Sequence, residues 1–153
     1  QLDTTGTVDA TPKILDANIE LYDTDAYWSG SIPSRFYIPT PGYYLVGAYI
    51  AWALNGSGDR GVTLIVTGAS SALGSVRHPA ATDDQTYQTF CGEDRFAAGI
   101  SIQVEVEQTS GSPLAVGGWF WIRRLAEDTS LATPSHSIAV QESVGVANVF
   151  TRS

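Results

Sequence analysis

Two histidines, His78 and His136, are the side chains of this sequence best suited to acid–base catalysis or transition-metal binding. Both lie in polar segments that read as loops, VRHPAAT and TPSHS. The chain has no Gly-x-Ser-x-Gly nucleophile motif and neither the His-x-x-x-His nor the Cys-x-x-Cys metal-binding spacing. A Ser-His-Asp triad assembles in space rather than in sequence, so that alternative stays open. The sequence therefore predicts a protein without enzyme activity, catalytic residues or cofactor.

Three acidic pairs are the next candidates, because carboxylate oxygens are ligands that calcium prefers. The pairs are Asp23 with Asp25, Asp83 with Asp84, and Glu93 with Asp94. Calcium takes about six to eight oxygens, so one pair is too few unless loops from one or three subunits converge. The competing interpretation is that Asp23 and Asp25 cap a turn through side-chain hydrogen bonds. We expect this capping role and no metal site.

Three aromatic residues outside the strand pattern, Tyr27, Trp28 and Tyr87, suit a surface that stacks on sugars or contacts a receptor. Trp28 lies in a Gly/Ser-rich loop, where an indole ring can equally plug the end of a β-sandwich. We expect the plug. Cys91 lies in a strand-like run, which is typical of an inert, buried thiol.

Composition excludes several classes of protein. The 153 residues carry a formal net charge of −8 and scattered arginines, so no nucleic-acid groove is expected. The longest uncharged stretches, near 43–54, are far shorter than the roughly 20 apolar residues of a membrane-spanning helix, so no membrane partner is expected. A single cysteine excludes an intramolecular disulfide. Fifteen glycines, seven prolines and many β-branched and aromatic residues predict one all-β domain rich in turns.

Short apolar or alternating runs bounded by turn residues predict a series of strands. The predicted strands are 19–22, 35–39, 43–53, 62–67, 73–77, 86–91, 100–107 and 114–125. Strands of this length and spacing favour a two-sheet sandwich or jelly roll. The Asn-Gly-Ser-Gly segment 55–58 predicts a hairpin loop. Strand 100–107 alternates apolar and polar residues, so one of its faces meets water.

Two of these strands, 43–53 and 114–125, are apolar on both faces. One face belongs to the core and carries Tyr44, Val46, Ile50, Phe120 and Ile122. The opposite face carries Leu45, Gly47, Tyr49, Trp119 and Trp121. A contiguous apolar patch of several hundred Å² on a soluble protein usually marks an interface. We therefore predict that copies of the chain associate through this face; the alternative is that the terminal segments of the same chain cover it.

Changes in composition divide the chain into three parts. Residues 1–18 are polar and predict an N-terminal arm, residues 19–125 form the sandwich, and residues 126–153 form a C-terminal extension. The extension contains strand-like apolar residues, which we expect to pair with or lie over a neighbouring protein. These residues are Ile138, Val140, Val144, Val146, Val149 and Phe150.

The order of PGYYLVGAYIAWA, GVTLIV, FAAGISIQVEVEQTSG and GWFWIRRL within residues 19–125 resembles the C1q/TNF-like trimeric jelly roll, especially its bacterial and phage members. The matching features are Gly42 and Tyr44 at the start of the long strand, Phe96 and Gly99 before the alternating strand, and the aromatic run 119–121. The resemblance implies a homotrimer whose threefold axis passes along the inner sheet. It places on that axis the same face that alternation alone leaves uncovered.

The resemblance also implies a function, that of a structural protein of a phage virion. We expect a trimeric decoration, or cement, protein on the capsid surface, with the phage major capsid protein as partner of the C-terminal extension. Two alternatives remain open: the receptor-binding head of a tail fibre or spike, and a lectin-like module that uses the loops around Trp28 and Tyr87.

Overall fold

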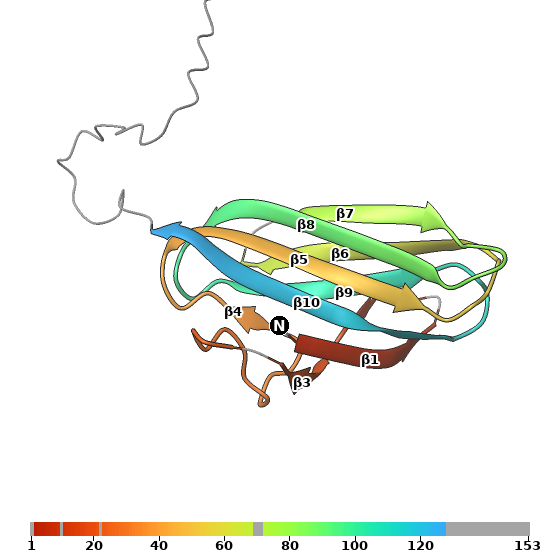
Figure 1. Ribbon diagram of the computed structural model, residues 1–153, viewed down its shortest axis with the longest axis horizontal. Helices are drawn as coiled ribbons and strands as arrows, with labels where there is room; N and C mark the ends of the chain where they lie inside the picture. Colours follow the sequence, from red (N-terminus) through yellow and green to blue (C-terminus); the bar gives the residue numbers. More distant parts are fainter. Residues whose placement is uncertain (1, 10, 22, 69–71, 128–153) are drawn as a thin grey trace, which may run out of the picture.

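The computed structural model describes residues 2–9, 11–21, 23–68 and 72–127, and these residues form ten β-strands and no helix (Figure 1). The strands are β1 (Leu2–Val8), β2 (Lys13–Ile14), β3 (Ala17–Glu20), β4 (Phe36–Tyr37), β5 (Gly42–Trp52), β6 (Asp59–Thr67), β7 (Ala72–Pro79), β8 (Thr86–Phe96), β9 (Ser101–Gln108) and β10 (Leu114–Glu127). The all-β prediction is thus confirmed. In the same part of the chain, no helix is long and apolar enough to cross a membrane.

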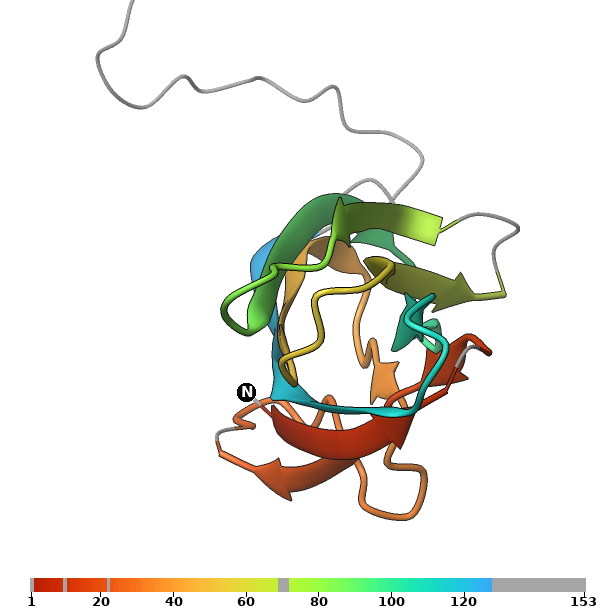
Figure 2. The same cartoon turned by 90° about the vertical axis from the view of Figure 1, so that its right-hand side faces the viewer.

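The strands build two antiparallel sheets that enclose one core. Sheet A has the strand order β3-β1-β10-β5-β8, and sheet B has the order β2-β9-β6-β7 with β4 also paired to β9. Viewed along the strands, the two sheets curve around a common interior (Figure 2). Strands that follow one another in sequence often lie in different sheets, so most pairings join distant parts of the chain.

Strand β5 lies inside sheet A and pairs along its whole length with β8 on one side and β10 on the other. Its aromatic and β-branched residues suit an extended backbone, and small residues at Gly47, Ala48 and Ala51 give room to neighbours on both faces. One face of β5 packs against the core, and on the other face Leu45, Tyr49 and Ala51 are only partly buried.

Alternating side chains of both sheets meet in the core. Its fully buried large residues include Trp52, Tyr44, Phe120, Leu15, Ile38, Ile50, Leu64 and Ile102. Phe36 and Phe120 come from opposite sheets and meet edge to face with ring centroids 4.2 Å apart. Strand β9 shows the predicted alternation, because Ile102, Val104 and Val106 are wholly buried.

The free edges of the two sheets meet where β7 approaches β8. A Cβ atom on Gly74 of β7 would lie 2.3 Å from a ring atom of Phe90 on β8, so only glycine leaves room for that ring. The pair closes the sandwich along this side. Phe90 packs against the core as a result.

The N-terminal segment requires a correction. Residues 1–18 were expected to form an arm, but residues 2–8 form β1, which lies between β3 and β10 within sheet A. Val8, Leu15 and Ala17 are buried in the core. A polar strand can occupy this place because its backbone groups pair with β10 along the whole of β1 and with β3 at residues 2–4.

Two boundaries also differ from the sequence prediction. The loop 55–58 does not close a hairpin, because β5 and β6 lie in different sheets and do not pair. Asn55 accepts a hydrogen bond from the backbone N–H of Ser57, so the turn signal is real but the turn belongs to a connection between sheets. Strand β10 continues to Glu127, and the rest of the C-terminal extension lies outside the described residues.

Candidate interaction surface

The surface of interest is the outer face of sheet A, which consists of the side chains of β10, β5 and β8 that point away from the core. The register aligns these residues in rows across the three strands. Trp119 lies opposite Tyr49, and Trp121 lies opposite Gly47. Gly47 lies in turn opposite Cys91. The five residues predicted for the interface, Leu45, Gly47, Tyr49, Trp119 and Trp121, therefore share one face, and their role in self-association stays a prediction.

Three aromatic rings form a column across this face, which we call the aromatic column: Tyr87 of β8, Tyr49 of β5 and Trp119 of β10. The rings of Tyr49 and Trp119 stack with centroids 4.3 Å apart and planes 20° apart. Those of Tyr49 and Tyr87 are 6.0 Å and 23° apart. Tyr49 thus lies between two rings. Cross-strand aromatic pairs of this kind stabilise the pairing of their strands.

Gly47 makes room for the second tryptophan of the face. A Cβ atom on Gly47 would lie 2.3 Å from Cζ2 and 2.5 Å from Cε2 of Trp121, closer than real atoms approach. The indole of Trp121 therefore lies directly on the backbone of β5 and is half-buried.

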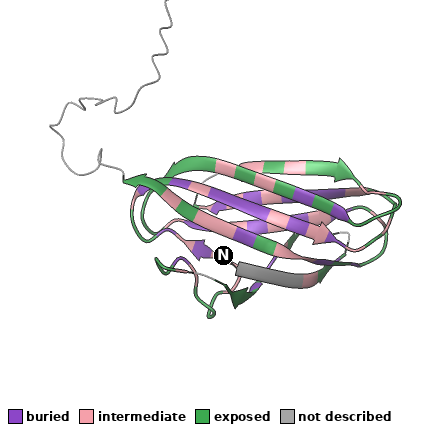
Figure 3. Cartoon of the chain, in the orientation of Figure 1, coloured by how far each residue is buried: buried purple, intermediate pink, exposed green. Residues whose placement is uncertain are grey.

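The outer face of sheet A remains open to solvent in the single chain (Figure 3). Trp119 is 40% exposed, Tyr43 45% and Tyr87 50%, and Leu125 near the end of β10 is 45% exposed. Of about 150–250 Å² per aromatic side chain, these exposed fractions leave roughly 200–340 Å² on the three aromatic residues together, an area of the few hundred Å² that often marks a functional surface.

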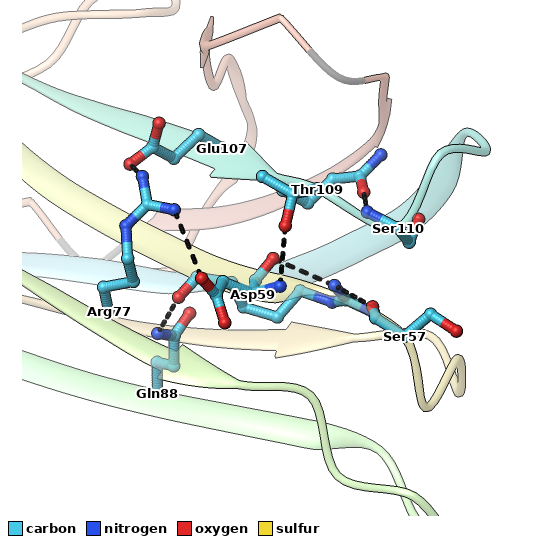
Figure 4. A network of polar contacts seen from close by, with 9 residues as sticks. Ser57, Asp59, Arg77, Gln88, Glu107, Thr109 and Ser110 are labelled. Carbon is cyan, nitrogen blue, oxygen red and sulfur yellow. Dashed lines mark hydrogen bonds and ion pairs between the residues drawn. The ribbon is translucent and has the colours of Figure 1, made fainter.

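The outer face of sheet B has the opposite character. Arg77 of β7 forms ion pairs with Asp59 of β6, at 3.8 Å, and with Glu107 of β9 (Figure 4). Thr109 accepts a hydrogen bond from the backbone N–H of Asp59 at 2.8 Å. Charged and polar groups are thus satisfied on the surface of sheet B. Of the two outer faces, that of sheet A carries the stacked aromatic residues.

The structure describes the residues predicted for the core but not those predicted for the C-terminal extension. Tyr44, Val46, Ile50 and Phe120 are wholly buried, and Ile122 packs partly buried against them. Ile138, Val140, Val144, Val146, Val149 and Phe150 lie outside the described residues. The role of these C-terminal residues as a partner-binding segment stays a prediction.

The acidic loop before β4 shows the predicted turn capping for Asp23 but not for Asp25. Its two carboxylate oxygens accept hydrogen bonds from the backbone N–H groups of Tyr27, at 3.0 Å, and Trp28, at 2.9 Å. Asp25 instead accepts a hydrogen bond of 2.8 Å from the hydroxyl of Tyr27. Burial, together with this hydrogen bond, raises the pKa of the Tyr27 phenol well above its usual range. Within the described residues, no group of three or more His, Cys, Asp or Glu side chains is arranged to hold a metal ion.

Trp28 and Cys91 differ in how well the sequence predicted them. Trp28 packs partly buried against the core and donates its indole N–H to the carbonyl of Pro33 at 3.1 Å, as a plug would. Cys91 is exposed, so the expectation of a buried thiol is wrong. The reason is its place on β8, where alternation turns it onto the outer face of sheet A. His78 is exposed on β7 rather than in a loop.

A buried polar network at one end of the sandwich was not foreseen. Arg60 of β6 is wholly buried, and its guanidinium donates to the backbone carbonyls of Asn55 at 2.7 Å, Ser57 at 2.9 Å and Asp59 at 2.9 Å. Burial lowers the pKa of this guanidinium. The carbonyl of Arg60 accepts a hydrogen bond from Gln88, which in turn accepts one from the indole of Trp52. The sequence does contain a signal for this network: Arg60 lies two residues before the apolar Val62 on one strand, so both side chains point into the core.

Comparison of the sequence with protein-family models and with curated protein sequences finds no match. Among solved structures, the globular domain of zebrafish complement 1qA protein is similar, with a TM-score of 0.55 and 13% identity over 84% of this chain and 100% of that one. Murine APRIL at pH 5.0 is similar with a TM-score of 0.51 and 11% identity, over 77% of this chain and 98% of that one. These likenesses show that the chain has the C1q/TNF-like jelly-roll fold that its sequence predicted.

Proposed function

We propose that the protein is a non-enzymatic structural and binding protein that acts as a homotrimer, with the outer face of sheet A turned toward a threefold axis. The observation that carries the proposal is the apolar composition of that face. Exposed apolar patches of a few hundred Å² on a folded domain often mark interaction sites. The contrast with the charged outer face of sheet B supports the same interpretation.

A second copy of the chain is a better cover than the terminal segments. The N-terminal segment is itself strand β1 of sheet A, so residues 2–8 lie beside the face rather than over it. The C-terminal residues 128–153 follow directly from β10 and remain a competing cover. A variant that ends at residue 127 keeps all of β10 and distinguishes the two covers.

Within this class, we propose a trimeric decoration protein on the surface of a phage head. The motif order described above supports a phage origin. Three C-terminal segments on one trimer would engage neighbouring capsid subunits together. Linked binding of this kind gives high avidity even when each segment binds weakly.

The test compares the full chain with the variant 1–127 on phage heads stripped of decoration protein. We expect the variant to remain trimeric in sedimentation velocity and to lose co-sedimentation with the heads. Retained binding would contradict the role of the C-terminal segment. Cryo-electron microscopy of the decorated head should place the trimer on the outer shell; density at the tail alone would refute the capsid role.

A receptor-binding or lectin-like module is the second candidate, favoured by the exposed ring of Tyr87. Sugars usually stack on a free ring face, but Tyr49 has a ring on each side, so the aromatic column presents mainly ring edges and its two ends. A glycan array with the intact protein tests this candidate. Saturable binding to one glycan class, lost in Tyr87→Ala, would favour it over the capsid role.

A further inference from the structure

The two flanks of the outer face of sheet A carry opposite charges at the same height along the strands. Arg123 of β10 lies opposite Leu45 of β5, and Leu45 lies opposite Glu93 of β8. We call these three residues the charged row. Figure 1 shows the three strands side by side in the order β10, β5, β8. The row therefore has a cation at one side, an apolar residue in the middle and an anion at the other side.

Both charged side chains of this row are available for a partner. Arg123 and Glu93 are exposed, and neither makes an ion pair with another of the described residues. One intervening strand separates them, so their Cα atoms are roughly 9–10 Å apart at the usual strand spacing. By contrast, Arg77 on sheet B is already paired with Asp59 and Glu107.

A ring of identical subunits places unlike flanks together. In a ring of three copies each interface is head to tail, so the flank of sheet A that carries β10, β1 and β3 meets the β8 flank of the next copy. Strand β1 pairs with β10 only as far as Phe120, so Arg123 lies beyond the end of β1 and β10 forms the flank at that height. A rotation about an axis that runs along the strands leaves every residue at its own height. The flank with Arg123 then meets the flank with Glu93, and neither charge meets its own copy.

We infer that Arg123 of one copy pairs with Glu93 of the next copy and that these pairs set the height at which the copies assemble. The inference rests on the proposed homotrimer and specifies its contact. An apolar surface alone tolerates sliding, since burial of area is not directional. Complementary charges on the two flanks penalise every shifted arrangement. The neighbouring row on one side, Trp121, Gly47 and Cys91, is uncharged. The row on the other side has Arg95 on β8 opposite Tyr43, so a shift by one row in that direction would bring Arg123 to a like charge in place of Glu93.

The test is a charge exchange measured by sedimentation equilibrium over a range of concentrations. Arg123→Glu and Glu93→Arg alone should each raise the midpoint concentration for dissociation by roughly tenfold or more, because each creates like-charge contacts at every interface. The double variant R123E/E93R should return to within about threefold of the unaltered protein. Glu105→Arg, the same change on the outer face of sheet B, is the matched control and should have no effect.

Each outcome decides between the inference and the proposed function. If the unaltered protein is a trimer and both single variants remain trimers at the same midpoint, the charge pairing is wrong and the homotrimer stands. A double variant no better than the single ones also overturns the pairing. If the unaltered protein is a monomer, the proposed function itself fails. Should a charge reversal prevent folding, Arg123→Gln and Glu93→Gln should still raise the midpoint, by about threefold.

Salt provides an independent readout. At about 1 M salt the screening length falls to roughly 3 Å, so the defect of each single variant should shrink. A defect that is unchanged by salt would point to disturbed packing and would contradict an electrostatic contact.

Discussion

Removal of the Trp119 side chain should weaken self-association strongly while the chain still folds. Trp119 is 40% exposed in the single chain. With about 150–250 Å² available per aromatic side chain, the part left to be covered by another copy is roughly 60–100 Å². At about 25 cal/mol per Å², covering it contributes about 1.5–2.5 kcal/mol per copy. Trp119→Ala should therefore cost a trimer about 5–8 kcal/mol.

The assay is sedimentation equilibrium of Trp119→Ala and the unaltered protein. The midpoint concentration of a trimer varies with the square root of its dissociation constant, so it should rise by roughly 70-fold to 900-fold. Ile65→Ala, which truncates an apolar side chain on the outer face of sheet B, should leave the midpoint unchanged. A folded Trp119→Ala protein with an unchanged midpoint would refute the reasoning. Loss of the stack on Tyr49 should also lower the free energy of unfolding, by about 0.5–1.5 kcal/mol.

Three further predictions concern single residues. Arg60→Met should lower the free energy of unfolding in urea by about 2–4 kcal/mol, because three backbone carbonyls lose their buried donor; a loss below about 1 kcal/mol would contradict the network's role. The raised pKa of Tyr27 stabilises the fold fully below the unfolded pKa of about 10, and this contribution falls as pH rises above it. Between about pH 9 and about pH 11, the free energy of unfolding of Tyr27→Phe should therefore fall less than that of the unaltered protein. Equal losses of free energy would contradict this contribution of Tyr27. Cys91 should react with a thiol reagent much more slowly in the assembled unaltered protein than in the dissociated Arg123→Glu variant. Equal rates would show that assembly does not cover the face on which Cys91 lies.

The sequence predicted the parts of the fold that depend on alternation. Residues 43–53, 100–107 and 114–125 show which side chains face the core because each strand has a period of two. The same period placed five residues together on the outer face of sheet A. Both results depend only on local geometry.

The parts that sequence reasoning missed depend on contacts between distant segments. Strand β1 is polar and was expected to be an arm, because only its pairing with β3 and β10 makes it a strand. The stacking of Tyr87 on Tyr49 cannot be read from the sequence, because the pairing of β8 with β5 is invisible in either segment alone. The Asn-Gly turn at 55–56 was correct as a turn, yet nothing local shows whether a turn joins two strands of one sheet or passes between two sheets.

The native mass of the unaltered protein tests the central claim most directly. Sedimentation equilibrium at low micromolar concentration should give about three times the chain mass of 16.3 kDa. A folded protein that sediments with the mass of one chain, while its tryptophan fluorescence reports a solvent-exposed indole, would show that the outer face of sheet A is stable in water and would contradict the account.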